Sequence, residues 1–253
     1  MITLSTILFK KNIALDTTFI ITAIILFLAA FTQGFSGFGF ALVSIPLLSL
    51  FVDIKYAIPL GALSGFVVNV YLAIELRKHI KFFELKNLLI GSVVGIPIGV
   101  YILSEFDPHL LKLILGILVL VFVILTLGSF IKTITLNNRW GYLFGLLSGT
   151  FGGAFNTNGP PVLIYFYLHG WDKLKFKSMI TGFFLITSLL IVVSHAVTGL
   201  TTKIIFYDFL LFLPAVLLGI IIGTNLFKKV SSELFKKIVL AALIVISFML
   251  IFN

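Results

Sequence analysis

Hydrophobic residues fall in ten stretches along this chain, separated by short polar loops. The stretches cover residues 17–33, 38–51, 57–76, 87–104, 110–131, 141–156, 160–169, 178–198, 204–226 and 235–252. A membrane-crossing α-helix needs about 20 residues, and the second and seventh stretches are the ones that read as too short. We therefore expect about eight full spans, with 38–51 and 160–169 as half-helices that either re-enter the membrane or complete a crossing.

The composition supports a membrane class for the whole chain. Hydrophobic residues make up 60% of it and charged residues 11%, and the mean hydropathy is +1.23. No water-soluble domain of this size could cover so much apolar surface, so the predicted fold class is all-α, a polytopic integral membrane helical bundle. The apolar runs are continuous, which excludes the alternating pattern of an outer-membrane barrel.

The basic residues indicate how the bundle is oriented. The net charge is +9, but Lys and Arg are scattered over short loops, which is typical of topology signals and not of a nucleic-acid surface. With the N-terminus outside, thirteen basic residues lie inside and five outside, namely Lys10, Lys11, Lys55, Lys112 and Lys203. We expect a multi-pass protein of the cell (cytoplasmic) membrane, in contact with membrane lipid and with its N-terminus outside.

Two glycine-rich stretches divide the chain into similar halves. Residues Gln33 to Gly39 run on to Pro46, and residues Ser148 to Gly159 run on to Pro161, so that a shift of 115 aligns their glycines and prolines. Five segments per half must enter the membrane in opposite senses, which predicts two inverted-topology repeats. The expected divisions are an N-terminal segment 1–16, repeat one 17–131, a cytoplasmic linker 132–140 and repeat two 141–253.

Matched interruptions of this kind predict a substrate site near the middle of the membrane. A helix that begins there exposes unpaired N–H groups and the positive end of its dipole, which suit an anion. The alternative role of such glycines is close helix packing, and for Asn69 interhelical bonding and cavity lining remain equally open. The predicted substrate-binding residues are Gln33, Gly34, Ser36, Gly37, Gly39, Asn69, Gly149, Thr150, Gly152, Gly153, Asn156, Thr157, Asn158 and Gly159.

Ionisable residues bear on both catalysis and coupling. All nine acidic and all eighteen basic residues lie in predicted loops or at span ends, so no cluster of carboxylates, histidines or arginines could serve an enzyme. We expect no catalytic residue, no metal and no cofactor, and the absence of cysteine removes thiolate chemistry. His195 is the only histidine within a predicted span; it is either a hydrogen-bonded structural residue or a proton-coupling residue.

The paired glycine-rich segments and the run Phe155-Asn-Thr-Asn-Gly-Pro-Pro161 resemble the sulfite exporter TauE/SafE family of membrane transporters. The resemblance covers about residues 19–252 and implies transport of small anions such as sulfite, thiosulfate or sulfoacetate. One departure is that Asn156 and Asn158 stand where the family often carries glycine.

Three functions are therefore weighed for this chain. The favoured one is a secondary transporter of small, sulfur-containing anions that works by alternating access around a midplane site of broken helices. The alternatives are a passive anion channel or facilitator and, least favoured, an integral-membrane lipid-processing enzyme. The expected partners are a small anionic substrate and membrane lipid, with no nucleic acid. The particular anion, the direction, the coupling ion and any homo-oligomer are left open.

Overall fold

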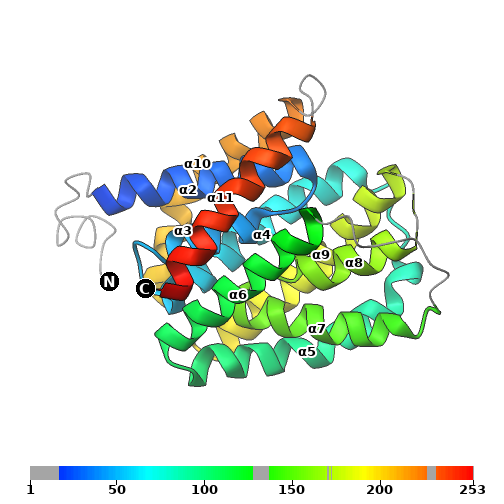
Figure 1. The fold of residues 1–253 in the computed structure, drawn as a ribbon, viewed down its shortest axis with the longest axis horizontal. Coiled ribbons are helices and arrows are strands. Elements are labelled where there is room, and N and C mark those ends of the chain that lie inside the picture. Colours follow the sequence, from blue (N-terminus) through cyan, green and yellow to red (C-terminus); the bar gives the residue numbers. More distant parts are fainter. Residues whose placement is uncertain (1–16, 128–136, 170, 172, 227–231, 253) are drawn as a thin grey trace, which may run out of the picture.

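The computed structural model describes residues 17–127, 137–169, 171, 173–226 and 232–252, and every regular element within them is helical (Figure 1). The elements are α2 (Thr17–Ser36), α3 (Phe40–Leu48), α4 (Ile54–Leu76), the 3-10 turn η1 (Phe82–Leu85), α5 (Lys86–Glu105), α6 (Pro108–Leu127), α7 (Trp140–Phe155), α8 (Gly159–Leu168), α9 (Lys173–Val197), α10 (Lys203–Leu226) and α11 (Ser232–Phe252). Each predicted stretch corresponds to one α-helix. The predicted segment 1–16 and residues 132–136 of the predicted linker lie outside the described residues.

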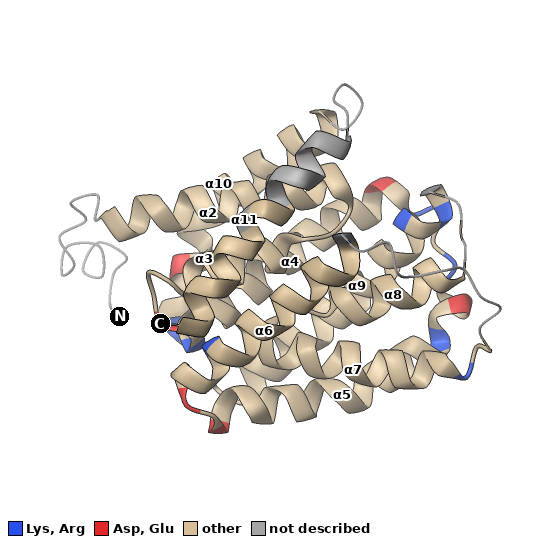
Figure 2. Ribbon diagram, viewed as in Figure 1, with Lys and Arg blue, Asp and Glu red and all other residues tan. Residues whose placement is uncertain are grey.

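Six helices in the described part of the chain are long and apolar enough to cross a membrane. They are α2, α4, α5 together with η1, α6, α9 and α10. The half-helices α3 and α8 have only 9 and 10 residues. Charged residues gather at the two ends of the bundle and leave its middle free of formal charge (Figure 2). The all-helical, multi-pass membrane class is thus confirmed.

Two helix breaks lie in the glycine-rich stretches. Between α2 and α3 the backbone turns through Gly37 and Gly39, whose φ angles are 85° and 105°. Between α7 and α8 it turns through Asn156, whose φ angle is 55°. Glycine adopts this left-handed conformation without strain, and asparagine tolerates it better than most residues. The two breaks therefore follow from local sequence.

The helices α5 and α7 pack side by side with their backbones in contact (Figure 1). A Cβ atom added to Gly95 would lie 2.2 Å from the carbonyl oxygen of Leu146, and one added to Gly99 would lie 2.1 Å from that of Thr150. No side chain fits there. Glycine allows this close approach, on which helix association in a membrane depends.

A second pair, α2 and α10, repeats this arrangement. A Cβ atom on Gly219 would lie 2.4 Å from the carbonyl oxygen of Phe27, and one on Gly223 would lie 2.3 Å from that of Phe31. The helix α4 packs against α9 between these pairs, and α6 packs separately against α11. Two tightly joined helix pairs therefore flank the central α4–α9 pair.

The breaks are separated by 119 residues and not by the 115 that best aligns the glycines in sequence. Ser36 and Phe155 end α2 and α7, while Phe40 and Gly159 begin α3 and α8. The left-handed residues Gly37 and Asn156 have the same separation.

The difference of four residues is one helical turn. In α7 small residues recur every four positions, at Gly145, Gly149 and Gly153, so sliding by one turn leaves glycine on the same helix face. In space, a Cβ atom added to Gly34 would lie 2.8 Å from the backbone oxygen of Ile220, and one added to Gly153 would lie 2.3 Å from that of Ile96. A glycine pattern alone does not distinguish these two alignments.

Candidate anion-binding site

A cavity lies where the two helix breaks meet the middle of α4 and α9. Its volume is about 30 Å³. Its lining comprises Gln33, Gly39, Phe40, Ala41, Leu42, Gly65, Asn69, Asn156, Thr157, Asn158, Gly159, Phe184 and Ser188. None of these side chains is ionisable, so any ligand is held by neutral groups.

Gln33 of α2 connects α3 and α4 at one side of the cavity. Its Nε2 donates to Asn69 Oδ1 over 2.6 Å, and its Oε1 accepts a hydrogen bond from the backbone N–H of Phe40 over 3.1 Å. The N-cap position of α3 is Gly39, which has no side chain to cap the helix. Gln33 therefore acts as a cap for α3 from the preceding helix and orients its first turn.

Asn156 is the one lining residue that places an unbonded amide in this buried space. The residue is only 8% exposed, and none of the described residues forms a hydrogen bond with its side-chain amide. On the α4 side the amide faces Gly61 and Gly65, where added Cβ atoms would lie in ordinary contact with Asn156 Nδ2, at 3.7 and 3.6 Å. This amide reaches the open space of the cavity and has no partner among the described residues, so it is available to a polar ligand.

The rest of the α7–α8 turn is held by hydrogen bonds. Asn158 Nδ2 donates to Thr187 Oγ1 of α9 over 2.8 Å. Ser148 of α7 donates to the carbonyl oxygen of Asn158, and the Thr157 hydroxyl donates to that of Phe155. These bonds position the turn, and they leave Asn156 as its adaptable donor.

Residues from the first turns of both α3 and α8 line the same cavity. The first N–H groups of a helix have no intrahelical acceptor, and its dipole places partial positive charge there. In α3 these donors include the N–H groups of Ala41 and Leu42. In α8 they are fewer, because Pro160 and Pro161 have no N–H group. The cavity thus faces the positive ends of two helix dipoles, with more N–H donors on the α3 side than on the α8 side. The amide of Asn156 adds a donor on the α8 side.

The structure brings seven of the predicted site residues to this cavity: Gln33, Gly39, Asn69, Asn156, Thr157, Asn158 and Gly159. The other seven do not line it. Gly34 faces α10, Gly149 and Gly153 face α5, and Gly152 faces Ile191 and the Cβ of Asn158. The Ser36 hydroxyl closes the α2–α3 turn, Gly37 lies under the Lys177 side chain, and Thr150 bonds back to Leu146.

Sequence reasoning did not select Gly65, Phe184 or Ser188. Gly65 lies one helical turn before Asn69, on the same face of α4, which is a signal that could have found it. Phe184 and Ser188 lie 119 residues after Gly65 and Asn69, so they could be found only once the spacing of the breaks was known.

His195 is fully buried, and it does not line the cavity. Its Nε2 lies 2.9 Å from the backbone oxygen of Gly153 in the last turn of α7, so the ring donates there and satisfies one of the carbonyl groups that a helix end leaves free. This geometry favours the structural role, in which His195 fastens α9 to the end of α7.

We expect replacement of His195 by leucine to lower thermal stability, because it leaves a buried carbonyl without a donor, which costs about 1–3 kcal/mol. Replacement by glutamine, which keeps an N–H donor, should retain more stability and leave the pH dependence of transport unchanged. Thermal unfolding in detergent and uptake over a range of pH check both. A pH profile that becomes flat in His195→Gln would instead indicate proton coupling.

Comparison with known proteins identifies a family. The sequence pattern of the family described as sulfite exporter TauE/SafE matches residues 22–250. No curated protein and no solved structure matches the chain.

Proposed function

Because the chain belongs to the sulfite exporter TauE/SafE family of membrane transporters, we propose that it is a secondary transporter whose substrate is a small sulfur-containing oxyanion bound in the cavity between α3 and α8. It is not an enzyme. The observation that carries the proposal is the unbonded amide of Asn156, which lies between two helix N-termini in a cavity free of charged side chains.

The chemistry of the lining suits an oxyanion such as sulfite. Each oxygen of such an ion accepts hydrogen bonds and donates none when deprotonated. Asn156 Nδ2 and the N–H groups of Ala41, Leu42 and Gly159 are donors that need acceptors. Hydrogen bonds to a charged partner are stronger than neutral ones. A site without a formal positive charge can still release the anion, which a transport cycle requires.

The two halves form inverted-topology repeats in this proposal, with α2–α6 equivalent to α7–α11. Support comes from the two helix pairs, in which Gly95 meets Leu146 as Gly219 meets Phe27. The cavity lies at the crossing of α4 and α9, the third helices of each half, where Asn69 Nδ2 lies 3.5 Å from the backbone oxygen of Phe184. Rocking of one half against the other would expose this cavity alternately to the two sides.

The basic loops determine the proposed orientation of the bundle in the membrane. The N-terminus is placed outside and the protein in the cell membrane, on the strength of the thirteen basic residues in loops on the predicted inner side. The cytoplasmic end of the bundle is then the one that contains η1 and the start of α9.

Counterflow in proteoliposomes tests the transport mechanism. Vesicles loaded with unlabelled sulfite and diluted into labelled sulfite should accumulate label transiently and saturably, because a carrier exchanges one bound anion for another. Thiosulfate and sulfoacetate inside the vesicles define the substrate class, and empty liposomes are the control. Flux that never saturates and shows no counterflow would identify a passive channel, whereas no flux of any of these anions would refute the proposed substrate class.

A further inference from the structure

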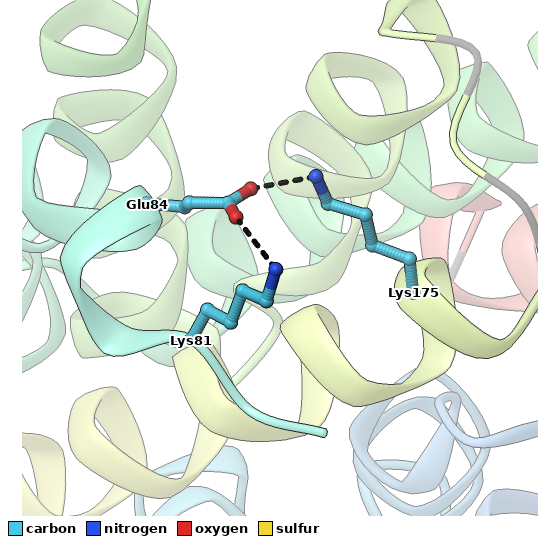
Figure 3. Close-up of polar contacts among 3 residues, drawn as sticks. All are labelled: Lys81, Glu84 and Lys175. Carbon is cyan, nitrogen blue, oxygen red and sulfur yellow. Dashed lines mark ion pairs between the residues drawn. The ribbon is translucent and has the colours of Figure 1, made fainter.

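Two acidic residues form matched contacts at opposite ends of the bundle. Near the start of α4, the Tyr56 hydroxyl donates to Asp208 Oδ2 of α10 over 2.7 Å. Near the start of α9, Lys175 Nζ lies 2.7 Å from Glu84 Oε2 of η1 (Figure 3). Both contacts link residues that are far apart in sequence.

The two contacts occupy equivalent places in the two halves. Tyr56 is the third residue of α4, and Lys175, 119 residues later, is the third residue of α9. Glu84 precedes Asp208 by 124 residues. The same two separations relate the helix-pair contacts, because Leu146 follows Phe27 by 119 residues and Gly219 follows Gly95 by 124. The Tyr56–Asp208 pair is therefore the counterpart of the Lys175–Glu84 pair.

The two pairs lie on opposite sides of the cavity. Lys175 at the start of α9 contacts Glu84 of η1, which begins six residues after α4 ends, so the two helices are antiparallel. Tyr56 precedes Gly65, and Lys175 precedes Phe184, by nine residues each, which is about 13 Å along a helix. Each pair is thus offset from the site toward its own end of the bundle.

Each pair also joins the central helices to a different outer helix pair. Tyr56 connects α4 to α10, which is packed tightly on α2. Lys175 connects α9 to η1, which leads directly into α5, and α5 is packed tightly on α7. Since α2 carries Gln33 and α7 leads into Asn156, movement of either outer pair would carry part of the cavity lining with it.

We propose that these two pairs are the gates of the transport cycle, with Tyr56–Asp208 closing one end of the cavity and Lys175–Glu84 closing the other. The inference rests on the proposed function for its role in transport. Loss of one pair weakens the attachment of the outer helix pair at that end and favours opening of the cavity there, while the other pair keeps the far end closed.

The two gates differ in chemistry. Tyr56–Asp208 is a hydrogen bond from a neutral donor, whereas Lys175–Glu84 is an ion pair in which Lys81 also approaches Glu84, at 3.8 Å, and Lys175 lies 4.6 Å from the ring centroid of Trp171. Salt screens an ion pair between partly exposed charges. High salt should therefore favour opening at the Lys175–Glu84 end.

The test measures from which side the cavity is accessible. The chain contains no cysteine, so Ser188→Cys places a single thiol in the cavity lining. Its rate of reaction with a membrane-impermeant methanethiosulfonate is measured in right-side-out and inside-out vesicles. Glu84→Gln should raise the rate about five-fold from the η1 end only, and Tyr56→Phe should raise it about five-fold from the opposite end only, as expected for the loss of one net hydrogen bond or ion pair.

Matched controls separate gating from general loosening. Tyr207→Phe and Glu105→Gln make the same chemical changes at exposed positions and should leave both rates unchanged. The exchange Glu84→Lys with Lys175→Glu rebuilds the ion pair and should return the rate toward that of the parent chain, even if a single variant folds poorly. Unchanged rates in either gate variant, a change from the wrong end, or a change from both ends would overturn the proposal.

The result is distinguishable from the outcome of the transport test, because labelling does not require flux. Side-specific labelling without counterflow of any tested anion would leave the gates standing and refute the proposed function. Counterflow without side-specific labelling would support the proposed function and refute the gates.

Discussion

Replacement of Asn156 by glycine should lower saturable uptake of the anion about ten-fold or more while leaving the fold intact. The amide of Asn156 faces the cavity and has no hydrogen-bond partner among the described residues, so its hydrogen bond is available to a ligand. A hydrogen bond to a charged partner contributes about 1.5–3 kcal/mol, which corresponds to a factor of about ten to a hundred in binding. Glycine suits the φ angle of 55° at least as well as asparagine, so the backbone is not strained.

Binding of sulfite to purified protein and counterflow into proteoliposomes measure this effect. Asn138→Gly, at an exposed turn before α7, is the control and should bind and transport as the parent chain does. Asn156→Asp should be more severe than Asn156→Gly, because it keeps the shape of the side chain and places a negative charge beside the anion. If Asn156→Gly transports every tested anion at the parent rate, the amide does not contact the substrate.

Replacement of Gly95 by alanine should destabilise the bundle by about 3 kcal/mol, near the upper end for overpacked interiors. The added Cβ would lie 2.2 Å from the Leu146 carbonyl oxygen and 2.8 Å from the Thr150 nitrogen. Both atoms belong to the backbone of α7, so no side-chain rotation relieves the contact and the two helices must separate. Since α7 leads into the turn that holds Asn156, transport should fall as well.

Reversible unfolding in mixed micelles measures the free energy of unfolding of Gly95→Ala. Val94→Ala is the matched control, because Val94 is the next residue of α5 and is half-exposed on the outer surface. Gly141→Ala should be intermediate, since its nearest neighbour at 2.9 Å is the Cβ of Asn87 and the nearest backbone atom is 3.4 Å away. A Gly95→Ala protein as stable as Val94→Ala would show that the α5–α7 backbones can separate at little cost.

The candidate site illustrates how far sequence reasoning reaches. Gln33, Asn156 and Asn158 were predicted because they belong to the matched glycine-rich interruptions, and Asn69 because an amide in a hydrophobic stretch needs partners. All four line the cavity. Of the predicted glycines, only Gly39 and Gly159 line the cavity. Gly34, Gly149 and Gly153 lie in the same glycine-rich stretch as Gly39 or in the matching one, yet they face neighbouring helix backbones. A glycine has no side chain whose chemistry could indicate its partner.

The sequence by itself determined that this is an all-helical membrane protein with two interrupted halves, because span length, charge placement and the positions of helix breaks are properties of the chain read in one dimension. Only the tertiary structure decided the spacing of 119 residues between the breaks, the set of residues that meet at the cavity, and the pairing of Tyr56 with Asp208. These depend on which helix faces meet, and a repeat of small residues every four positions is compatible with more than one way of packing them.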